Sequence, residues 1–313
     1  MINGILVIYK EKGFTSFDVI AKLRGILKQK KIGHTGTLDP DAVGVLPVCI
    51  GNATKLCDML TDKKKEYIAE FVLGKITDTQ DISGTILEEH KVTCKEEDVK
   101  KVITDFIGDI KQIPPMYSAI KIDGKRLYEL AREGKEVERK ERSIRIDDIE
   151  ILSLCIPNVK IRVMCSKGTY IRTLCHDIGQ KLSCGATMTS LERTQSGAFT
   201  KDMAFTLKEV EELRDLNHLM EHIMPVDSVF SEYPALFVSD YLLKKVLNGN
   251  LILRNELMKL LEEDRERNNQ TYPQEGDKFR IYGKNEDTVT FLALYEFKSE
   301  KDGLTPMKMF LSI

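Results

Sequence analysis

The chain has 313 residues, of which 42% are hydrophobic and 31% are charged. This length and balance exclude a disordered chain and favour a globular protein with two domains. The formal net charge is −2, so nucleic-acid binding cannot be argued from overall charge and would need a local basic surface.

The seven cysteines form no C-x-x-C pair, and the five histidines form no cluster with them, which argues against a zinc site. An odd, scattered set of thiols predicts a reduced, cytoplasmic protein. The longest uncharged run, residues 42–54, is too short to span a bilayer. The N-terminus leads directly into an apolar run, so we expect no targeting segment and no membrane association.

The first predicted elements are a strand at residues 4–9 and a helix that begins at Thr15 or Ser16 and runs to about residue 30. The stretch from Val19 to Leu38 contains no acidic residue but five basic ones: Lys22, Arg24, Lys28, Lys30 and Lys31. A basic helix face is often only a solvated face. This one, however, delivers the chain to a loop of unusual composition.

That loop, residues 33–47, holds three glycines, two prolines, two aspartates and one histidine. Pro40 disfavours a helical conformation at Asp39, so Asp39 is expected on a loop held by turn chemistry on both sides. An ordinary surface turn has a similar composition. A single carboxylate that follows a basic segment, however, is typical of a site that binds a polyanion and places its reacting group next to Asp39.

The next predicted elements are strands at residues 45–50 and 66–74, the second of which contains Tyr67, with a short helix at 54–60 between them. Residues 77–84 form an acidic, turn-rich segment. Thr93 and Glu96 then form a capping-box pattern for a helix that runs to about residue 106.

A distinct section begins near residue 112. Residues 121–145 contain nine basic and six acidic residues, and a helix is predicted at 125–133, ended by Gly134. We interpret residues 114–145 as an exposed basic insertion that could clamp a phosphate backbone. The alternative is a solvated, charged hairpin.

Two neighbouring strands are predicted at residues 143–154 and 159–165, and a turn at 167–169 leads into another helix. From Cys155 to His176 there is again no acid, although four basic residues are present. Arg172 falls in the first turn of this helix, where the helix dipole disfavours a cation. We therefore expect a carboxylate partner for Arg172.

A further strand at residues 186–194 contains Leu191, and a helix follows at 207–213. The composition changes around residues 228–234, which predicts one domain at 1–230 and a second at 231–313. The second contains strands at 278–282 and 288–297 and a charged segment at 256–269 that is either an insertion or a loose helix.

Four motifs, at residues 33–40 with 44–47, 65–67, 113–119 and 166–172, resemble those of the tRNA pseudouridine-55 synthase family (TruB type), in the family's order and rough spacing. The resemblance covers about residues 3–230. It implies an α+β catalytic domain, built on a mixed, largely antiparallel sheet with flanking helices and a basic insertion. The C-terminal domain more weakly resembles a PUA-like RNA-binding β domain.

The resemblance implies that the chain isomerises one uridine, at position 55 in the T-arm of tRNA, to pseudouridine by base flipping. No cofactor, no metal and no obligatory protein partner are expected. Asp39 matches the family's catalytic aspartate and Arg172 the arginine that pairs with it. Tyr67 matches the aromatic residue that stacks on the target base, and its phenol is a candidate general base.

Three more residues match substrate-binding positions. His34 matches the residue that fills the gap left by the flipped nucleotide, and Tyr170 and Leu191 match residues that line the uracil pocket. The sequence leaves open whether Asp39 attacks C1′, attacks C6 or assists elimination at C2′.

The chain also departs from the family's pattern. Tyr9-Lys10-Glu11 stands where the family often has Asp-Lys-Pro, and Glu192 stands where an arginine is common. The acid at position 192 is expected to remove a phosphate contact and could weaken RNA docking.

Three other interpretations remain. Asp39-Pro40-Asp41 could be the D-x-D motif of an aspartyl-phosphate phosphatase, but it does not follow a buried strand directly. The chain could be an RNA-binding or tRNA-folding protein with little catalysis. It could also be a synthase for a different RNA.

Overall fold

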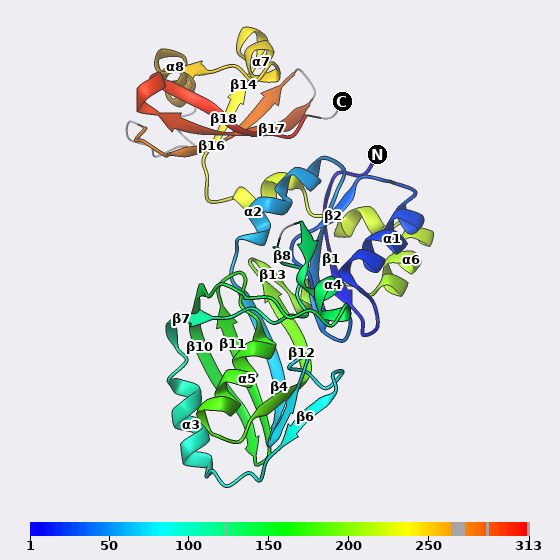
Figure 1. The fold of residues 1–313 in the computed structure, drawn as a ribbon. Coiled ribbons are helices and arrows are strands. Elements are labelled where there is room, and N and C mark those ends of the chain that lie inside the picture. Colours follow the sequence, from blue (N-terminus) through cyan, green and yellow to red (C-terminus); the bar gives the residue numbers. More distant parts are fainter. Residues whose placement is uncertain (123, 264–272, 286–287, 312–313) are drawn as a thin grey trace.

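The structure is a computed structural model, and it describes residues 1–122, 124–263, 273–285 and 288–311. Within these residues the strands form two main sheets that share no strand. Figure 1 shows the larger sheet in an elongated body that carries most of the helices, with the smaller sheet beside one end of it. No helix in the described ranges is both long enough and apolar enough to cross a membrane.

The larger sheet contains nine described strands: β1 (Gly4–Lys10), β2 (Ile32–His34), β3 (Val43–Ile50), β4 (Lys65–Leu73), β7 (Gly108–Gln112), β10 (Arg142–Cys155), β11 (Asn158–Cys165), β12 (Ala186–Ser196) and β13 (Phe199–Thr200). Seven lie in the order β1-β3-β12-β4-β11-β10-β7, while β2 pairs with β3 and β13 with β12. Among these described pairs only β12 with β3 is parallel. The prediction of an α+β fold on a mixed, largely antiparallel sheet is therefore confirmed.

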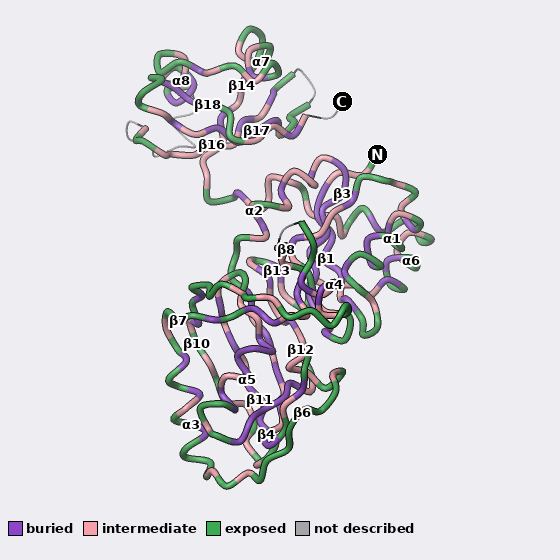
Figure 2. The backbone as a smooth tube through the Cα atoms, in the orientation of Figure 1, coloured by how far each residue is buried: buried purple, intermediate pink, exposed green. Residues whose placement is uncertain are grey.

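Helices cover the sheet at both ends (Figures 1 and 2). α1 (Ser16–Leu27) and α6 (Leu207–Asp215) pack with β1 and β3, and α3 (Glu96–Thr104) and α5 (Ile171–Lys181) pack with β4, β10 and β11. α1 begins where predicted, because Thr15 and Asp18 form a capping box. It ends at Leu27 because Lys28 is left-handed, with a φ of 49°.

Two predicted helices differ in their starts. The predicted capping box of Thr93 and Glu96 is wrong: the Lys95 amide donates instead to the Asp98 carboxylate at 3.0 Å, and α3 begins at Glu96, two residues later than a cap at Thr93 implies. The predicted helix at 54–60 is a 3-10 helix, η1 (Gly51–Leu56), followed by the short α2 (Cys57–Thr61).

The predicted insertion contains a two-stranded hairpin, β8 (Lys121–Ile122) and β9 (Lys125–Arg126), followed by α4 (Leu127–Arg132). Residue 123 lies outside the described residues. The helix is shorter than predicted because residues 125 and 126 pair with the preceding strand. Leu127 and Leu130 are buried, so this part of the insertion packs on the protein instead of projecting freely.

The smaller sheet has the order β14-β16-β17-β18-β15. Together with two helices it comprises β14 (Ala235–Val238), α7 (Asp240–Leu247), β15 (Ile252–Leu253), α8 (Arg254–Glu263), β16 (Lys278–Lys284), β17 (Val289–Lys298) and β18 (Gly303–Met309). Its core includes the buried Leu236, Phe279 and Tyr295. The charged segment predicted at 256–269 forms part of α8, and its residues 264–269 lie outside the described residues.

Candidate active site

The loop that carries Asp39 connects β2 to β3 and is fixed by its neighbours. Leu38 and Ala42 are 3% and 2% exposed and belong to the core that also contains Tyr67 of β4. The Leu38 amide donates a 2.9 Å hydrogen bond to Ser16 Oγ at the start of α1. The Ala42 amide closes a turn on the Asp39 carbonyl at 3.1 Å. Asp39 is thus held between two buried residues.

The carbonyl of Pro40 fixes the part of this loop that follows Asp39. It accepts hydrogen bonds from the Gly13 amide at 2.9 Å and from Lys10 Nζ at 3.1 Å. Lys10 is fully buried and also donates to the Phe14 carbonyl at 2.6 Å. Burial lowers the pKa of Lys10 to about 8, while the charge of Asp39 raises it. Lys10 therefore joins β1 to the Asp39 loop.

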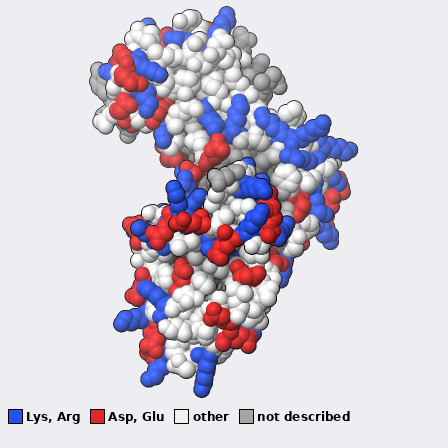
Figure 3. All heavy atoms as spheres, viewed as in Figure 1, with Lys and Arg blue, Asp and Glu red and all other residues white. Residues whose placement is uncertain are grey.

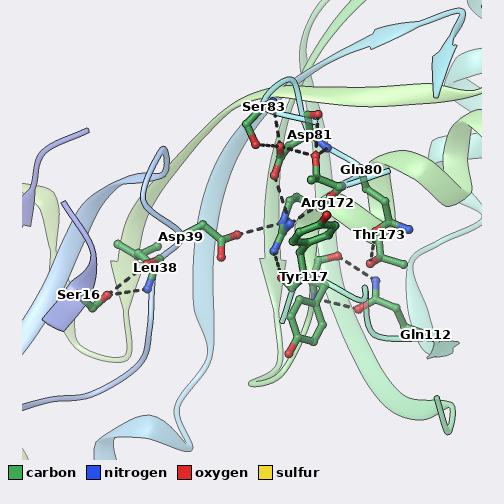
Figure 4. Close-up of polar contacts among 12 residues, drawn as sticks. Ser16, Leu38, Asp39, Gln80, Asp81, Ser83, Gln112, Tyr117, Arg172 and Thr173 are labelled. Carbon is green, nitrogen blue, oxygen red and sulfur yellow. Dashed lines mark hydrogen bonds and ion pairs between the residues drawn. The ribbon is translucent and has the colours of Figure 1, made fainter. Parts of the chain in front are cut away.

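Asp39 pairs with Arg172 at the start of α5 (Figure 4). Arg172 Nε lies 3.0 Å from Asp39 Oδ2, and the Arg172 side chain is 6% exposed, against 43% for Asp39. Burial raises the pKa of Asp39 above its ordinary value, and the Arg172 guanidinium opposes this rise. The carboxylate is anchored on its buried side and open to solvent on the other.

Arg172 binds a second carboxylate, which sequence reasoning missed. Its Nη1 donates to the Thr79 carbonyl at 3.0 Å and to Asp81 Oδ2 at 3.2 Å, and its Nη2 donates to the Tyr117 carbonyl at 2.9 Å. Asp81 lies in the acidic turn between β5 (Lys75–Thr77) and β6 (Ile86–Glu89). That acidic turn was the available signal, but sequence alone does not connect it with Arg172.

Asp81 is itself held in place. The Ser83 amide and Thr79 Oγ1 donate to Asp81 Oδ1 at 3.0 and 2.8 Å, and the Ile82 amide donates to the Met188 carbonyl on β12 at 2.9 Å. The charge of Asp81 raises the pKa of Asp39. Arg172 is therefore shared between two carboxylates, and only part of its charge serves Asp39.

Tyr67 lies on β4 and is 9% exposed. In the sheet it pairs with Arg193 of β12, whose positive charge acts on the Tyr67 phenol. Burial raises the pKa of Tyr67, and Arg193 opposes this effect. Arg193 is a second residue that sequence reasoning missed, because it resembles any polar residue near a strand end.

His34 ends β2, and its Nδ1 accepts a hydrogen bond from the Gly36 amide at 3.3 Å. Burial and the charge of Arg193 lower the pKa of His34, so its ring is neutral at neutral pH. His34 makes no hydrogen bond or ion pair with Asp39, Tyr67 or Arg172, all of which are described residues. The structure thus brings Asp39 and Arg172 into contact, whereas His34 is linked to Arg193 through Gly36.

Tyr170 lies next to Arg172 at the start of α5, and Leu191 lies near Tyr67. Tyr170 caps α5, and its amide and carbonyl are bound by the side chain of Gln112 at 2.8 and 3.0 Å. Leu191 is half-buried on β12 and packs against the core that includes Tyr67. Among the described residues, no three His, Cys, Asp or Glu side chains gather closely enough to bind a metal ion.

The chain is similar to known proteins over almost its whole length. The profile of the TruB family pseudouridylate synthase N-terminal domain matches residues 24–171, and that of the tRNA pseudouridylate synthase B C-terminal domain matches residues 172–231. The tRNA pseudouridine synthase B of Lachnoclostridium phytofermentans is 49% identical over 317 residues, covering 99% of this chain and all of that protein. That of Clostridium novyi is 52% identical and covers 79% of this chain and 84% of the relative.

Among solved structures, a chain of a Cbf5–Nop10–Gar1 complex superposes with a TM-score of 0.71 at 26% identity, covering 98% of this chain and 85% of that chain. The fold, the family match and these relatives together define an isomerase of the pseudouridine synthase class. Within that class, the chain belongs to the TruB family. Its activity is that of a tRNA pseudouridine synthase, with tRNA as the substrate.

Proposed function

We propose that the chain converts the uridine at position 55 in the T-arm of tRNA to pseudouridine, with Asp39 as the catalytic carboxylate. The observation that carries the proposal is the Asp39–Arg172 pair, in which a buried cation presents one half-exposed carboxylate. A carboxylate in this setting can meet a nucleotide only if the base leaves its stack, so the mechanism includes base flipping.

The reaction needs one bond exchanged and two protons moved. The N1–C1′ bond breaks while the Asp39 carboxylate supplies negative charge to the nucleoside, and the uracil turns so that C5 bonds to C1′. The C5 proton then leaves, its electron pair restores the ring double bond, and N1 takes a proton. Tyr67 supplies the base for the C5 proton and stacks on the uracil, while Tyr170 and Leu191 line the pocket. His34 occupies the place of the flipped nucleotide.

Local basic surface supports binding to the T-arm. Figure 3 shows Lys and Arg side chains gathered around the N-terminus and α1, whereas charges of both signs alternate over the body that carries α3 and β10. In the insertion, Lys125 and Lys135 lie 3.7 and 2.8 Å from the exposed Glu133. Such exposed pairs are weak, so these lysines can exchange Glu133 for phosphate at little cost.

The same proposal assigns residues 1–230, with the insertion at 114–145, to catalysis and residues 231–313 to a PUA-like RNA-binding domain. The separate sheet of the C-terminal part supports this division. Leu294 and Phe310 join that part to the body, because they share a hydrophobic cluster with Ile5 of β1.

The test is tritium release from a T-arm hairpin labelled at C5 of its uridines, without added metal or protein partner. Wild type is compared with Asp39→Asn and with Asp41→Asn, a control in the same loop whose side chain is exposed. We expect release by wild type and Asp41→Asn and none by Asp39→Asn, although all three bind the hairpin. A second hairpin with cytidine in place of the target uridine should abolish release.

Equal release by Asp39→Asn would contradict the catalytic assignment. Binding without release by the wild type would instead favour an RNA-binding role or a different RNA substrate, and the same assay on full-length tRNA would separate these two outcomes.

A further inference from the structure

Arg193 is the largest fully buried side chain among the described residues, with 1% of its surface exposed. No Asp or Glu of the described part of the chain forms an ion pair with it. Its guanidinium is satisfied by neutral oxygens: Nε donates to the Val45 carbonyl at 2.7 Å, and Nη2 donates to the Gly36 carbonyl at 3.2 Å. Burying a cation without a carboxylate partner is costly, so this position requires an explanation.

The pairing of β12 with its two neighbours explains how Arg193 reaches the site. Arg193 pairs with Tyr67 across the antiparallel β4 and with Gly44 across the parallel β3. Residues directly opposite each other in an antiparallel pair project from the same face of the sheet, which places the guanidinium beside the phenol. Gly44 has a φ of 109°, and a Cβ there would collide with the Arg193 carbonyl. Glycine at 44 therefore permits this close approach.

The same guanidinium also fixes the turn that follows His34. It binds the Gly36 carbonyl, while the amide of Gly36 donates to His34 Nδ1. One buried cation thus binds two segments of the proposed site, the His34 turn and the start of β3, and pairs across the sheet with a third residue, Tyr67.

The charges around Tyr67 oppose one another. Burial and the nearby Asp39 both disfavour the phenolate, and Arg193 favours it through its charge. The phenolate is the form that can accept the C5 proton. Without a cation at this position, a buried tyrosine facing a carboxylate would be a poor base.

We propose that Arg193 is a positioning residue that acts through Tyr67: its guanidinium orients the phenol oxygen and stabilises the negative charge on it until it takes the C5 proton. This inference rests on the proposed function of Tyr67. In the step itself, the proton passes from C5 to the phenolate oxygen, N1 gains a proton from solvent, and the resulting phenol returns its proton to solvent.

The test replaces Arg193 by Lys and by Gln, each in the wild-type and Tyr67→Phe backgrounds, and measures single-turnover pseudouridine formation on a T-arm hairpin. Arg193→Gln should lower the rate by about tenfold or more in the wild type, because acid–base catalysis is worth at least that much. In the Tyr67→Phe background it should change the rate by less than about twofold, because the group through which it acts is absent. An equal loss in both backgrounds would overturn the proposal in favour of a purely structural role.

A second measurement does not depend on activity. Fluorotyrosine placed at position 67 in the full chain reports phenol ionisation by ¹⁹F NMR, and its titration midpoint should rise by about one pH unit in Arg193→Lys, which loses the planar, multiply bonded guanidinium. Arg162→Gln, an exposed arginine on the neighbouring β11, is the matched control and should leave the midpoint unchanged. This titration uses Arg193→Lys, so it tests the proposal even if Arg193→Gln does not fold.

An unchanged midpoint in folded Arg193→Lys would overturn the coupling between Arg193 and Tyr67. Full activity of Tyr67→Phe would instead remove the base role of Tyr67 and leave the measured coupling intact. The two failures are therefore distinguishable.

Discussion

The phenol of Tyr9 donates a 2.9 Å hydrogen bond to the carboxylate of Glu192. Two of the positions at which the sequence departs from the family's usual motifs therefore contact each other. Lys201 completes the group, with its ammonium 2.6 Å from the Glu192 carboxylate and 5.5 Å from the centre of the Tyr9 ring. The charge of Glu192 is satisfied within the protein, so a loss of RNA affinity does not follow from the acid at this position.

Glu192→Gln should lower the free energy of unfolding by about 1 kcal/mol, because a hydrogen bond and a partly exposed ion pair are weakened. Affinity for tRNA should stay within about twofold of wild type. Urea unfolding and filter binding measure the two quantities, and a cycle with Tyr9→Phe isolates the Tyr9–Glu192 coupling. A large gain in tRNA affinity in Glu192→Gln would show that Glu192 repels the RNA after all.

Arg172→Lys should shift the acidic limb of the pH–rate profile to higher pH. The guanidinium opposes the rise in the pKa of Asp39, so weakening it raises that pKa further. Asp39 acts as a carboxylate, and a higher pKa means that activity is lost earlier as pH falls. We also expect a fall in rate of about a hundredfold, because lysine cannot keep the fork of contacts to Asp39, Asp81 and Tyr117. Single-turnover rates across the acid range test both effects.

Asp81→Asn should shift the same limb in the opposite direction. Asp81 raises the pKa of Asp39, so removing its charge lowers that pKa and gives Asp39 a larger share of Arg172. Activity should then persist to lower pH even if the maximal rate falls. A shift toward higher pH would mean that Asp81 serves Asp39 only by orienting Arg172.

Lys10→Met should destabilise the protein by about 1–3 kcal/mol, because buried carbonyls lose their donor. The sign of its pH dependence is distinctive. The pKa of Lys10 falls from 10.5 to about 8 on folding, so between these values the unfolded chain binds more protons and Lys10 adds stability as pH rises. Urea unfolding at pH values below and within this window should show a rise in wild type that is smaller in Lys10→Met. The exposed Lys12→Met is the control.

Binding of tRNA should weaken steeply between about 50 and 200 mM salt, because lysines that neutralise phosphates release counterions. Changing Lys28, Lys30 and Lys31 together to Gln should reduce the slope of log affinity against log salt by up to about 0.9 for each phosphate that the variant no longer neutralises. The same change at Lys95, Lys100 and Lys101, in and beside α3, should leave the slope unchanged. Equal slopes for both triple variants would place the RNA elsewhere on the surface.

Local chemistry made much of the fold predictable. Thr15 predicted the start of α1, where the structure shows it as the N-cap, and Pro40 disfavours a helical conformation in the Asp39 loop. The start of α3 could not be predicted from a cap pattern, because its N-cap is Lys95, whose side chain accepts no hydrogen bond and whose amide binds Asp98. The family resemblance named Asp39, Tyr67 and Arg172, whereas the residues alone left Asp39 compatible with an ordinary surface turn.

The rest of the site depends on contacts between distant segments. From the sequence, Asp81 is only a turn residue. The structure shows that Arg172 of α5 binds it. From the sequence, Arg193 is only a polar residue on a strand. It reaches the site because β12 lies between β3 and β4, and no local sequence pattern predicts this pairing. Long-range pairing of this kind is decided by the packing of the whole sheet.

The Asp39 loop is secured through the amide of Leu38, the carbonyl of Pro40 and the amide of Ala42. A catalytic loop secured in this way has little conformational freedom to give up when substrate arrives. In the proposed reaction, the work of reaching the reactive geometry then falls on the nucleic acid, which must unstack a nucleotide to present it. Discrimination between uridines would accordingly reflect how easily each RNA loop deforms, and a uridine already extruded in the free RNA would react fastest.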